Sequence, residues 1–177
     1  MKPALPFERV ARWDLQVCLR TNRLCRSFSW RWLFRIVSAL GDGIAWYALM
    51  AVLLLCDRGA ALKPVLQMIA TGLCCTVIYK WIKARTLRPR PYQAHAAIRS
   101  FAAPLDRFSF PSGHTLHATA FTLIALNHYP ALAWLLVPFT LLVAVSRVVL
   151  GLHYPSDVLA GAALGAAIAA ASFVVLP

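Results

Sequence analysis

Charged residues are scarce in this 177-residue chain. Asp, Glu, Lys and Arg make up 14% of it, against about 25% in average soluble domains, whereas 60% of its residues are hydrophobic. This shortage excludes a fold that faces water on all sides. The mean hydropathy of +0.67 predicts several membrane spans of about 20 residues each. The length suits one domain and is too short for a membrane domain plus a soluble one.

Acidic residues are scarcer still. Six Asp and Glu stand against 18 Lys and Arg, so the formal net charge is +12. Such an excess indicates an anionic partner. The chain has no helix-turn-helix, zinc-finger or RNP-type signature, so nucleic acid is excluded as the predicted partner. The high hydrophobic content favours anionic lipid headgroups or a phosphorylated substrate.

A disulfide framework and a removable leader are also missing from the pattern. The five Cys are an odd number, and Cys56, Cys74 and Cys75 lie inside apolar stretches, where cysteine behaves as a small hydrophobic residue. The N-terminal region carries Arg throughout and lacks a short apolar core before a small-residue cleavage site. We therefore expect neither structural disulfides nor a cleaved signal peptide.

Residues 1–34 alternate Arg with aromatic and aliphatic residues at roughly helical spacing. Arg20, Arg23 and Arg26 make a spanning role costly, because each charge at a bilayer centre costs about 2.5–3.5 kcal/mol. The pattern predicts an amphipathic helix that lies in the membrane interface. A plain basic tail is the alternative.

Five apolar segments follow and predict the fold class, an all-α integral-membrane helical bundle of about five spans within residues 35–177. They are residues 36–56, 64–82, 115–129, 131–150 and 158–176. The third segment is short and contains His117, so we expect it to be packed inside the bundle. The last segment is rich in small residues around Gly161 and Gly165, which favours close helix packing.

The polar stretch 83–113 is the longest connection and is dense in Arg, Pro and Ser. Long loops in compact proteins are usually functional. If the spans alternate in direction, this stretch and residues 146–157 lie on the same face of the membrane. That face gathers Lys83, Arg85, Arg88, Arg90, Ser112, Gly113, His114, Arg147, His153 and Asp157.

This group of residues is suited to a phosphoryl group. The planar fork of Arg matches phosphate oxygens in bidentate fashion, and Lys adds a point charge. The stretch 111–114 opens the third apolar segment, where free backbone N–H groups favour an anion. Since His153 and Asp157 are four residues apart, the carboxylate can accept a proton from one ring nitrogen and leave the other free for attack.

Each part of this group also has a simpler interpretation. The Arg residues within 85–90 could form an ordinary cationic loop, and Ser112 and Gly113 could only cap a helix. His114 and His117, three residues apart, could bind a metal ion.

Four further polar residues lack a visible partner in the sequence. Asp42, in the first apolar segment, is predicted to be a packing or supporting acid. Asp106, His95 and His128 are predicted to be ordinary loop residues.

Taken together, three motifs carry a family resemblance. They are Lys83, six residues, Arg90-Pro91; Pro111-Ser112-Gly113-His114; and Ser146-Arg147, five residues, His153, three residues, Asp157. In this order they resemble the motifs of the type 2 phosphatidic acid phosphatase family, which also includes vanadium haloperoxidases and bacterial acid phosphatases. The resemblance covers residues 83–157 and implies a helical bundle with its catalytic residues near one membrane surface.

The resemblance also implies roles for individual residues. His153 would be the nucleophile that forms a phosphohistidine, Asp157 its orienting partner, and His114 the acid that protonates the leaving oxygen. The phosphoryl oxygens would be bound by Lys83, Arg90, Ser112, Gly113 and Arg147. No metal and no other cofactor is implied.

The predicted function is therefore a multi-pass membrane phosphatase acting on a lipid phosphomonoester or diphosphate. The alternatives are a phosphotransferase that uses the same phosphohistidine, and a transporter whose cations bind an anion in transit. The lipid phosphatases of the family commonly have six spans, whereas this sequence predicts five and an amphipathic segment; the missing span would be the first, outside the motifs.

Two features of the chain point to opposite sides of the membrane for the predicted catalytic residues. Of the 18 Lys and Arg, all except Arg58 and Lys63 lie on the predicted catalytic side, and the positive-inside rule would place that side in the cytoplasm. In bacterial members of the family, however, the site usually faces the periplasm, and cations selected for substrate binding are poor reporters of topology. For a chain of the bacterial inner membrane, we favour the periplasmic face.

Overall fold

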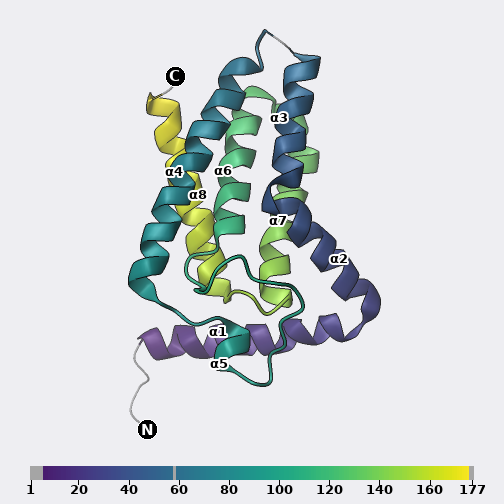
Figure 1. Ribbon diagram of the computed structural model, residues 1–177, viewed down its shortest axis with the longest axis vertical. Coiled ribbons are helices and arrows are strands. Elements are labelled where there is room, and N and C mark those ends of the chain that lie inside the picture. The colour runs from purple at the N-terminus through teal and green to yellow at the C-terminus, as the bar shows by residue number, and fades with distance from the viewer. Residues whose placement is uncertain (1–5, 58, 176–177) are drawn as a thin grey trace.

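The structure is a computed structural model that describes residues 6–57 and 59–175, and the elements in those ranges are all helical. Long helices run side by side along the vertical axis of Figure 1. They are α3 (Ala45–Cys56), α4 (Leu62–Thr86), α6 (Gly113–His128), α7 (Ala133–Val149) and α8 (Pro155–Val175), and α2 (Phe28–Ala39) leads obliquely into α3. The predicted all-α helical bundle is confirmed.

Four helical stretches are long and apolar enough to cross a membrane. They are Phe28–Cys56, Leu62–Ala94, Pro130–Val149 and Pro155–Val175. The third predicted span corresponds to α6, which has only 16 residues and lies among α4, α7 and α8 (Figure 1). As expected from its polar character, α6 is the central helix of the bundle, and neighbouring helices bury or partly bury most of its side chains.

The N-terminal helix α1 (Pro6–Asn22) lies across the lower end of the bundle in Figure 1, as an interfacial helix would. The interfacial segment was predicted to continue to residue 34. Instead, the chain turns at the short helix η1 (Arg23–Arg26), and α2 rises from Phe28 into the first long stretch. Exposed Trp30 and Trp32 suit this membrane-surface end of α2. Residues 1–5 and the predicted end of the last span at Leu176 lie outside the described residues.

A kink separates α2 from α3. The segment η2 (Leu40–Ile44) has non-helical dihedral angles at Asp42 and a φ of +124° at Gly43, which a residue with a Cβ would adopt only with strain. A Cβ on the neighbouring Gly41 would lie 2.7 Å from Cγ2 of Val143, so this glycine lets the kink pack directly on α7. The kink places the Asp42 carboxylate beside the bundle interior.

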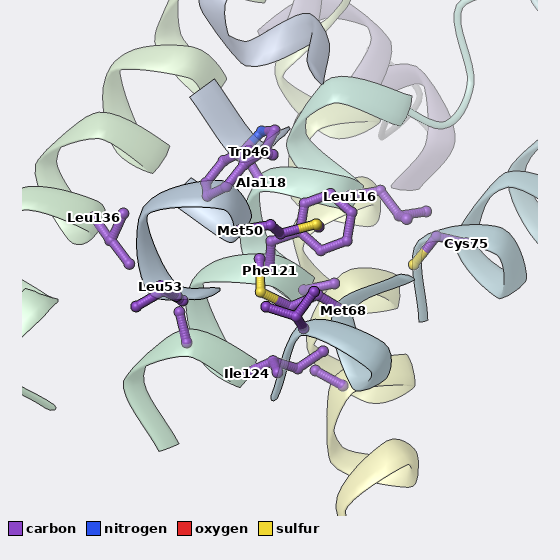
Figure 2. Close-up of a cluster of buried hydrophobic side chains, with 14 of the residues drawn as sticks. Trp46, Met50, Leu53, Met68, Cys75, Leu116, Ala118, Phe121, Ile124 and Leu136 are labelled. Carbon is purple, nitrogen blue, oxygen red and sulfur yellow. The ribbon is translucent and has the colours of Figure 1, made fainter. Parts of the chain in front are cut away.

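The apolar core fills the middle of the bundle (Figure 2). Trp46 of α3 is almost completely buried, and its ring centroid lies 5.5 Å from those of both Phe121 and Phe139. In a membrane, lipid tails are as apolar as these side chains, so van der Waals packing and not exclusion from water stabilises such contacts. This packing links α3 with α6 and α7.

Helices α6 and α8 approach each other through glycines. A Cβ on Gly165 would lie 2.3 Å from the Leu116 carbonyl oxygen, and one on Gly161 would lie 2.5 Å from that of Ser112. The close packing predicted from small residues is confirmed. Its consequence for function is positional, because the backbone N–H of Ser112 donates to the carbonyl of Asp157 at 3.0 Å. The start of α6 and the start of α8 are thereby joined.

Candidate active site

The end of α4, the start of α6 and the α7–α8 connection surround a cavity of about 280 Å³. The loop that follows α5 (Pro91–Ala94) covers the same end of the bundle (Figure 1). The polar side chains that line the cavity include Asp42, Lys83, Arg90, Asp106, His114, His117, Arg147 and His153. The prediction that stretches 83–113 and 146–157 share one face is therefore confirmed.

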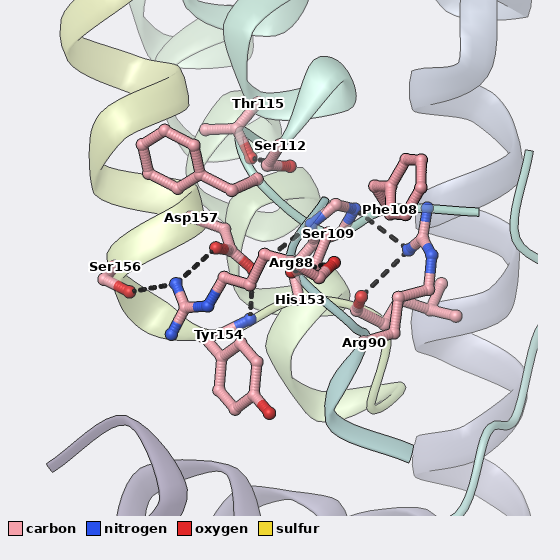
Figure 3. Close-up of polar contacts among 12 residues, drawn as sticks. Arg88, Arg90, Phe108, Ser109, Ser112, Thr115, His153, Tyr154, Ser156 and Asp157 are labelled. Atoms are coloured by element: carbon pink, nitrogen blue, oxygen red, sulfur yellow. Dashed lines mark hydrogen bonds and ion pairs between the residues drawn. The ribbon is translucent and has the colours of Figure 1, made fainter. Parts of the chain in front are cut away.

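His153 lies in the connection between α7 and α8 and is 1% exposed. Its Nε2 is 3.2 Å from a guanidinium nitrogen of Arg90 (Figure 3). Because a guanidinium only donates hydrogen bonds, Nε2 is the acceptor and the ring proton resides on Nδ1. Nδ1 faces Oδ2 of Asp157 at 3.6 Å and has no hydrogen-bond partner among the described residues. In this arrangement the lone pair of Nε2 accepts Arg90, so Arg90 has to shift toward a bound anion before Nε2 can attack.

The surroundings of His153 favour the neutral ring. Burial lowers the pKa of His153 well below its usual value, and the positive charges of Arg147, Arg90 and Lys83 lower it further. A neutral imidazole carries the Nε2 lone pair that can attack an electrophile once the hydrogen bond from Arg90 is released.

Asp157 is held firmly in the first turn of α8. Its side chain is fully buried, Oδ2 accepts the backbone N–H of Tyr154 at 2.8 Å, and Oδ1 accepts Arg88 at 2.6 Å (Figure 3). Two donors on opposite oxygens leave the carboxylate little freedom to rotate. Asp157 therefore presents a fixed negative charge to the proton-bearing edge of His153.

Three buried cations, Lys83, Arg90 and Arg147, line the cavity as predicted. Arg90 donates to the carbonyl of Leu152 at 2.8 Å, which fixes its guanidinium next to the nucleophile candidate. Arg147 donates to the hydroxyl of Ser38, and its Nε is buried with no hydrogen-bond partner among the described residues. An anion in the cavity would meet donors from α4, α7 and the segment between α4 and α5.

Asp106 was predicted to be an ordinary loop residue, and this prediction is wrong. Its carboxylate accepts Nζ of Lys83 at 2.8 and 2.9 Å and Nη2 of Arg90 at 2.9 Å. Burial alone would raise the pKa of Asp106, but the hydrogen bonds and charges of Lys83 and Arg90 together lower it. The only sequence signal was that Asp106 is the one acid in the cationic stretch 83–113.

His114 lies in the first turn of α6 and lines the cavity. Its Nε2 is 3.4 Å from Oδ1 of Asp42, which the η2 kink carries to this point. The sequence prediction of Asp42 as a supporting acid agrees with this position. Burial and the positive charges of Arg147 and Arg90 favour the neutral ring of His114, whereas Asp42 and an anion bound in the cavity would favour the protonated ring.

His117 also lines the cavity, and both of its ring nitrogens lie near groups of the bundle. Its Nδ1 lies 2.9 Å from the carbonyl of Gly113, and its Nε2 lies 3.2 Å from the hydroxyl of Thr76. Within residues 6–57 and 59–175, no group of three or more His, Cys, Asp or Glu side chains is arranged to hold a metal ion. The positive charge in the cavity comes from Lys and Arg.

Ser112 and Gly113 occupy the N-terminus of α6, but only Gly113 lines the cavity. The Ser112 hydroxyl is fully buried and lies 3.0 Å from that of Thr115. Direct contact between Ser112 and a phosphate stays a prediction. The first-turn backbone of α6 is closer to the cavity than that hydroxyl.

Arg88 differs from the sequence interpretation, which grouped it with the phosphate-facing cations. Its guanidinium bonds to two carboxylates, Asp157 at 2.6 Å and Asp14 at 2.8 Å, and lies over the ring of Tyr154. Arg88 does not line the cavity. It lies behind the cavity and contacts the acid that faces His153.

The other half of the cavity is apolar. Its walls are Trp46, Tyr47 and Met50 from α3, with Met68, Ile69 and Leu73 from α4. Tyr47 and Leu73 are 71% and 66% exposed, so this half lies next to the lipid-facing surface of the bundle. A ligand with an anionic end and an apolar chain fits both halves.

The family model of the PAP2 superfamily matches residues 60–177. Undecaprenyl-diphosphatase BcrC of Bacillus subtilis (strain 168) is 34% identical over 116 residues, which is 66% of this chain and 60% of that protein. Decaprenylphosphoryl-5-phosphoribose phosphatase of Mycobacterium tuberculosis (strain ATCC 25618 / H37Rv) is 40% identical over 91 residues, which is 50% of this chain and 48% of that protein. The aligned part is thus 60% or less of each of these relatives.

The fold is shared with a solved structure, a transmembrane PAP2-type phosphatidylglycerolphosphate phosphatase from Bacillus subtilis. The two superpose with a TM-score of 0.70 at 22% sequence identity, covering 94% of this chain and 86% of the other. Together with the apolar helices, this likeness shows a multi-pass membrane protein.

Proposed function

We propose that this chain, which belongs to the PAP2 superfamily, is an integral-membrane phosphatase that hydrolyses a phosphomonoester or diphosphate on a lipid. One observation carries the proposal. A buried, neutral His153 lines a cavity that Lys83, Arg90 and Arg147 make cationic. Phosphoryl transfer needs mainly positioning and charge stabilisation, and this cavity provides both.

In the first step, the three cations bind the non-bridging oxygens of the phosphoryl group. Nε2 of His153 attacks phosphorus, the P–N bond forms, and the bond from phosphorus to the leaving oxygen breaks. Protonated His114 donates its proton to that oxygen, which departs as a lipid alcohol or, from a diphosphate, as a lipid phosphate. Asp157 stabilises the positive charge that develops on the His153 ring.

In the second step, water attacks the phosphohistidine. His114, now neutral, accepts a proton from the water, the P–N bond breaks, and inorganic phosphate leaves. Both histidines then return to their starting states. Burial and the neighbouring cations favour neutral His114, so the first step requires Asp42, at 3.4 Å, and the bound anionic phosphoryl group together to hold its proton.

The apolar half of the cavity supports a lipid substrate. The lipid chain would leave between α3 and α4, past the exposed Tyr47 and Leu73, while the phosphate stays with the cations. The two relatives described above are named for undecaprenyl and decaprenyl lipids, so we propose an isoprenoid phosphate or diphosphate as the first candidate substrate. A lipid A 1-phosphatase of Rhizobium etli, 28% identical over 153 residues, makes lipid A the second.

The test is phosphate release from a panel of undecaprenyl diphosphate, undecaprenyl phosphate, phosphatidic acid, phosphatidylglycerol phosphate and lipid A. His153→Ala should lower turnover by orders of magnitude, and rapid quenching should trap phosphate on the wild-type protein only. His128→Ala, at the far end of α6, is the matched control and should keep full turnover. Near wild-type turnover by folded His153→Ala would contradict the nucleophile assignment, and transfer to an acceptor other than water would indicate a phosphotransferase.

We also propose that residues 35–177 form the catalytic domain in a bacterial inner membrane, with the cavity facing the periplasm. The bacterial origin of the relatives supports the assignment to a bacterial membrane. A single cysteine at Ala96, in a variant without the five native Cys, would be treated in intact cells with a membrane-impermeant thiol reagent. Labelling is expected before permeabilisation. Labelling only afterwards would place the site in the cytoplasm.

A further inference from the structure

Helix α1 touches the site through one face. Asp14, Cys18 and Asn22 are spaced by four residues, and all three are buried. The thiol of Cys18 lies 3.7 Å from the carbonyl oxygen of His153, and Asn22 donates to the carbonyl of Val149 at 3.0 Å. This face of α1 therefore packs on the connection that carries His153, although α1 precedes the family-matched residues 60–177.

Asp14 makes the strongest of these contacts. Its side chain is fully buried, Oδ1 accepts the backbone N–H of Ser156 at 2.9 Å, and Oδ2 accepts both the Ser156 hydroxyl and Arg88, the latter at 2.8 Å. Arg88 also donates to the Ser156 hydroxyl at 2.8 Å and to Asp157 at 2.6 Å (Figure 3). One guanidinium thus joins the carboxylate of α1 to the carboxylate that faces His153.

This arrangement affects the charge available to the nucleophile. An arginine bound to Asp157 alone would neutralise most of its charge and weaken its hold on the proton of His153 Nδ1. Arg88 bound to two carboxylates has its charge divided between them. Asp157 therefore keeps more negative charge for His153.

We propose that Asp14 is a positioning residue of the active site, which holds and neutralises Arg88 so that Asp157 can orient and charge-stabilise His153. The proposal rests on the proposed function of His153. It assigns a role in catalysis to a helix that lies at the membrane surface and outside the matched family region. Asp14 touches no cavity-lining surface, so its effect is on turnover and not on substrate binding.

The test uses the full chain in detergent with undecaprenyl diphosphate as the probe. Asp14→Asn keeps the shape but puts an amide donor against the Arg88 donor. Loss of a hydrogen bond between charged groups predicts a fall in kcat of roughly tenfold to hundredfold, with KM nearly unchanged. Glu8→Gln removes the same charge from the exposed side of α1 and should leave both constants unchanged.

Two further variants separate positioning from docking of α1. Asn22→Ala removes buried contacts of α1 to Val149 and Arg99 without touching Arg88, so it should lower thermal stability but not kcat. In an Arg88→Gln background, Asp14→Asn should have little further effect, because the charge that it balances is gone. Equal loss of kcat in Asn22→Ala, or full additivity with Arg88→Gln, would overturn the proposal.

A measurement without turnover keeps the test separate from the proposed function. The ¹⁵N signals of labelled histidine report which ring nitrogen carries the proton. The charged groups around His153 are Arg90 at Nε2, Asp157 at Nδ1, and Lys83 and Arg147 across the cavity. Asp14→Asn should shift the Nδ1 signal of His153, and Glu8→Gln should not. An unchanged signal would overturn the positioning role, whereas a wild-type protein inactive on every lipid phosphate would overturn only the proposed phosphatase.

Discussion

Replacement of Asp106 by Asn should tighten the binding of inorganic phosphate. In the structure, Nζ of Lys83 is already used by both Asp106 oxygens and by the carbonyl of Phe108 at 2.8 Å. Arg90 donates to the same carboxylate. A phosphate that binds Lys83 and Arg90 must therefore displace an acid that occupies their donors.

The size of the effect follows from the bonds that a phosphate has to break. A hydrogen bond to a charged group is worth about 1.5–3 kcal/mol when buried. The Asp106 side chain is 36% exposed, so solvent screening reduces the net cost of the displacement to just below this range, about 1.4 kcal/mol. This free energy corresponds to about a tenfold lower inhibition constant for phosphate in Asp106→Asn.

The assay is inhibition of turnover by orthophosphate, measured for the wild type and for Asp106→Asn. Asp57→Asn is the matched control, since it removes one carboxylate at the opposite end of the bundle, where Asp57 accepts the hydroxyl of Tyr129. The control should keep the wild-type inhibition constant. If Asp106→Asn bound phosphate no more tightly than the wild type, Asp106 would not compete with phosphate and the reasoning would be refuted.

Three other outcomes are expected. Gly165→Ala should lower the free energy of unfolding by about 1–3 kcal/mol, because its Cβ meets the Leu116 carbonyl. Gly59→Ala, whose Cβ would have no atom within 4 Å, should leave the melting temperature in detergent unchanged. Equal melting temperatures of the two variants would contradict the packing argument. Chelation should not slow phosphate release and orthovanadate should inhibit it, whereas activity restored by one particular metal would support metal binding at His114. The folded protein holds His153 neutral, whereas the unfolded chain protonates it near pH 6.5, so thermal stability should fall as the pH drops from about 6.5 to 5. This fall should be weaker in His153→Gln. An identical fall in both proteins would be evidence against the lowered pKa of His153.

The sequence by itself determined the fold class and the composition of the site. Apolar segments separated by short connections define a helical bundle, since a membrane admits few other structures. Successive spans alternate in direction, so residues as distant as Lys83 and His153 had to reach one face. The motif spacings then identified the cations and histidines that the structure places around the cavity.

Only the tertiary structure decided which partners these residues have. Asp106 lies 23 residues from Lys83, and Asp14 lies 74 from Arg88. Such pairs depend on how far each helix is rotated and tilted against its neighbours, which a pattern of apolar residues along one helix does not specify. The turn of the chain before Phe28, the kink that delivers Asp42 and the apolar half of the cavity have the same origin. Each arises where two segments meet, and the contact energy is shared between residues that are far apart in the chain.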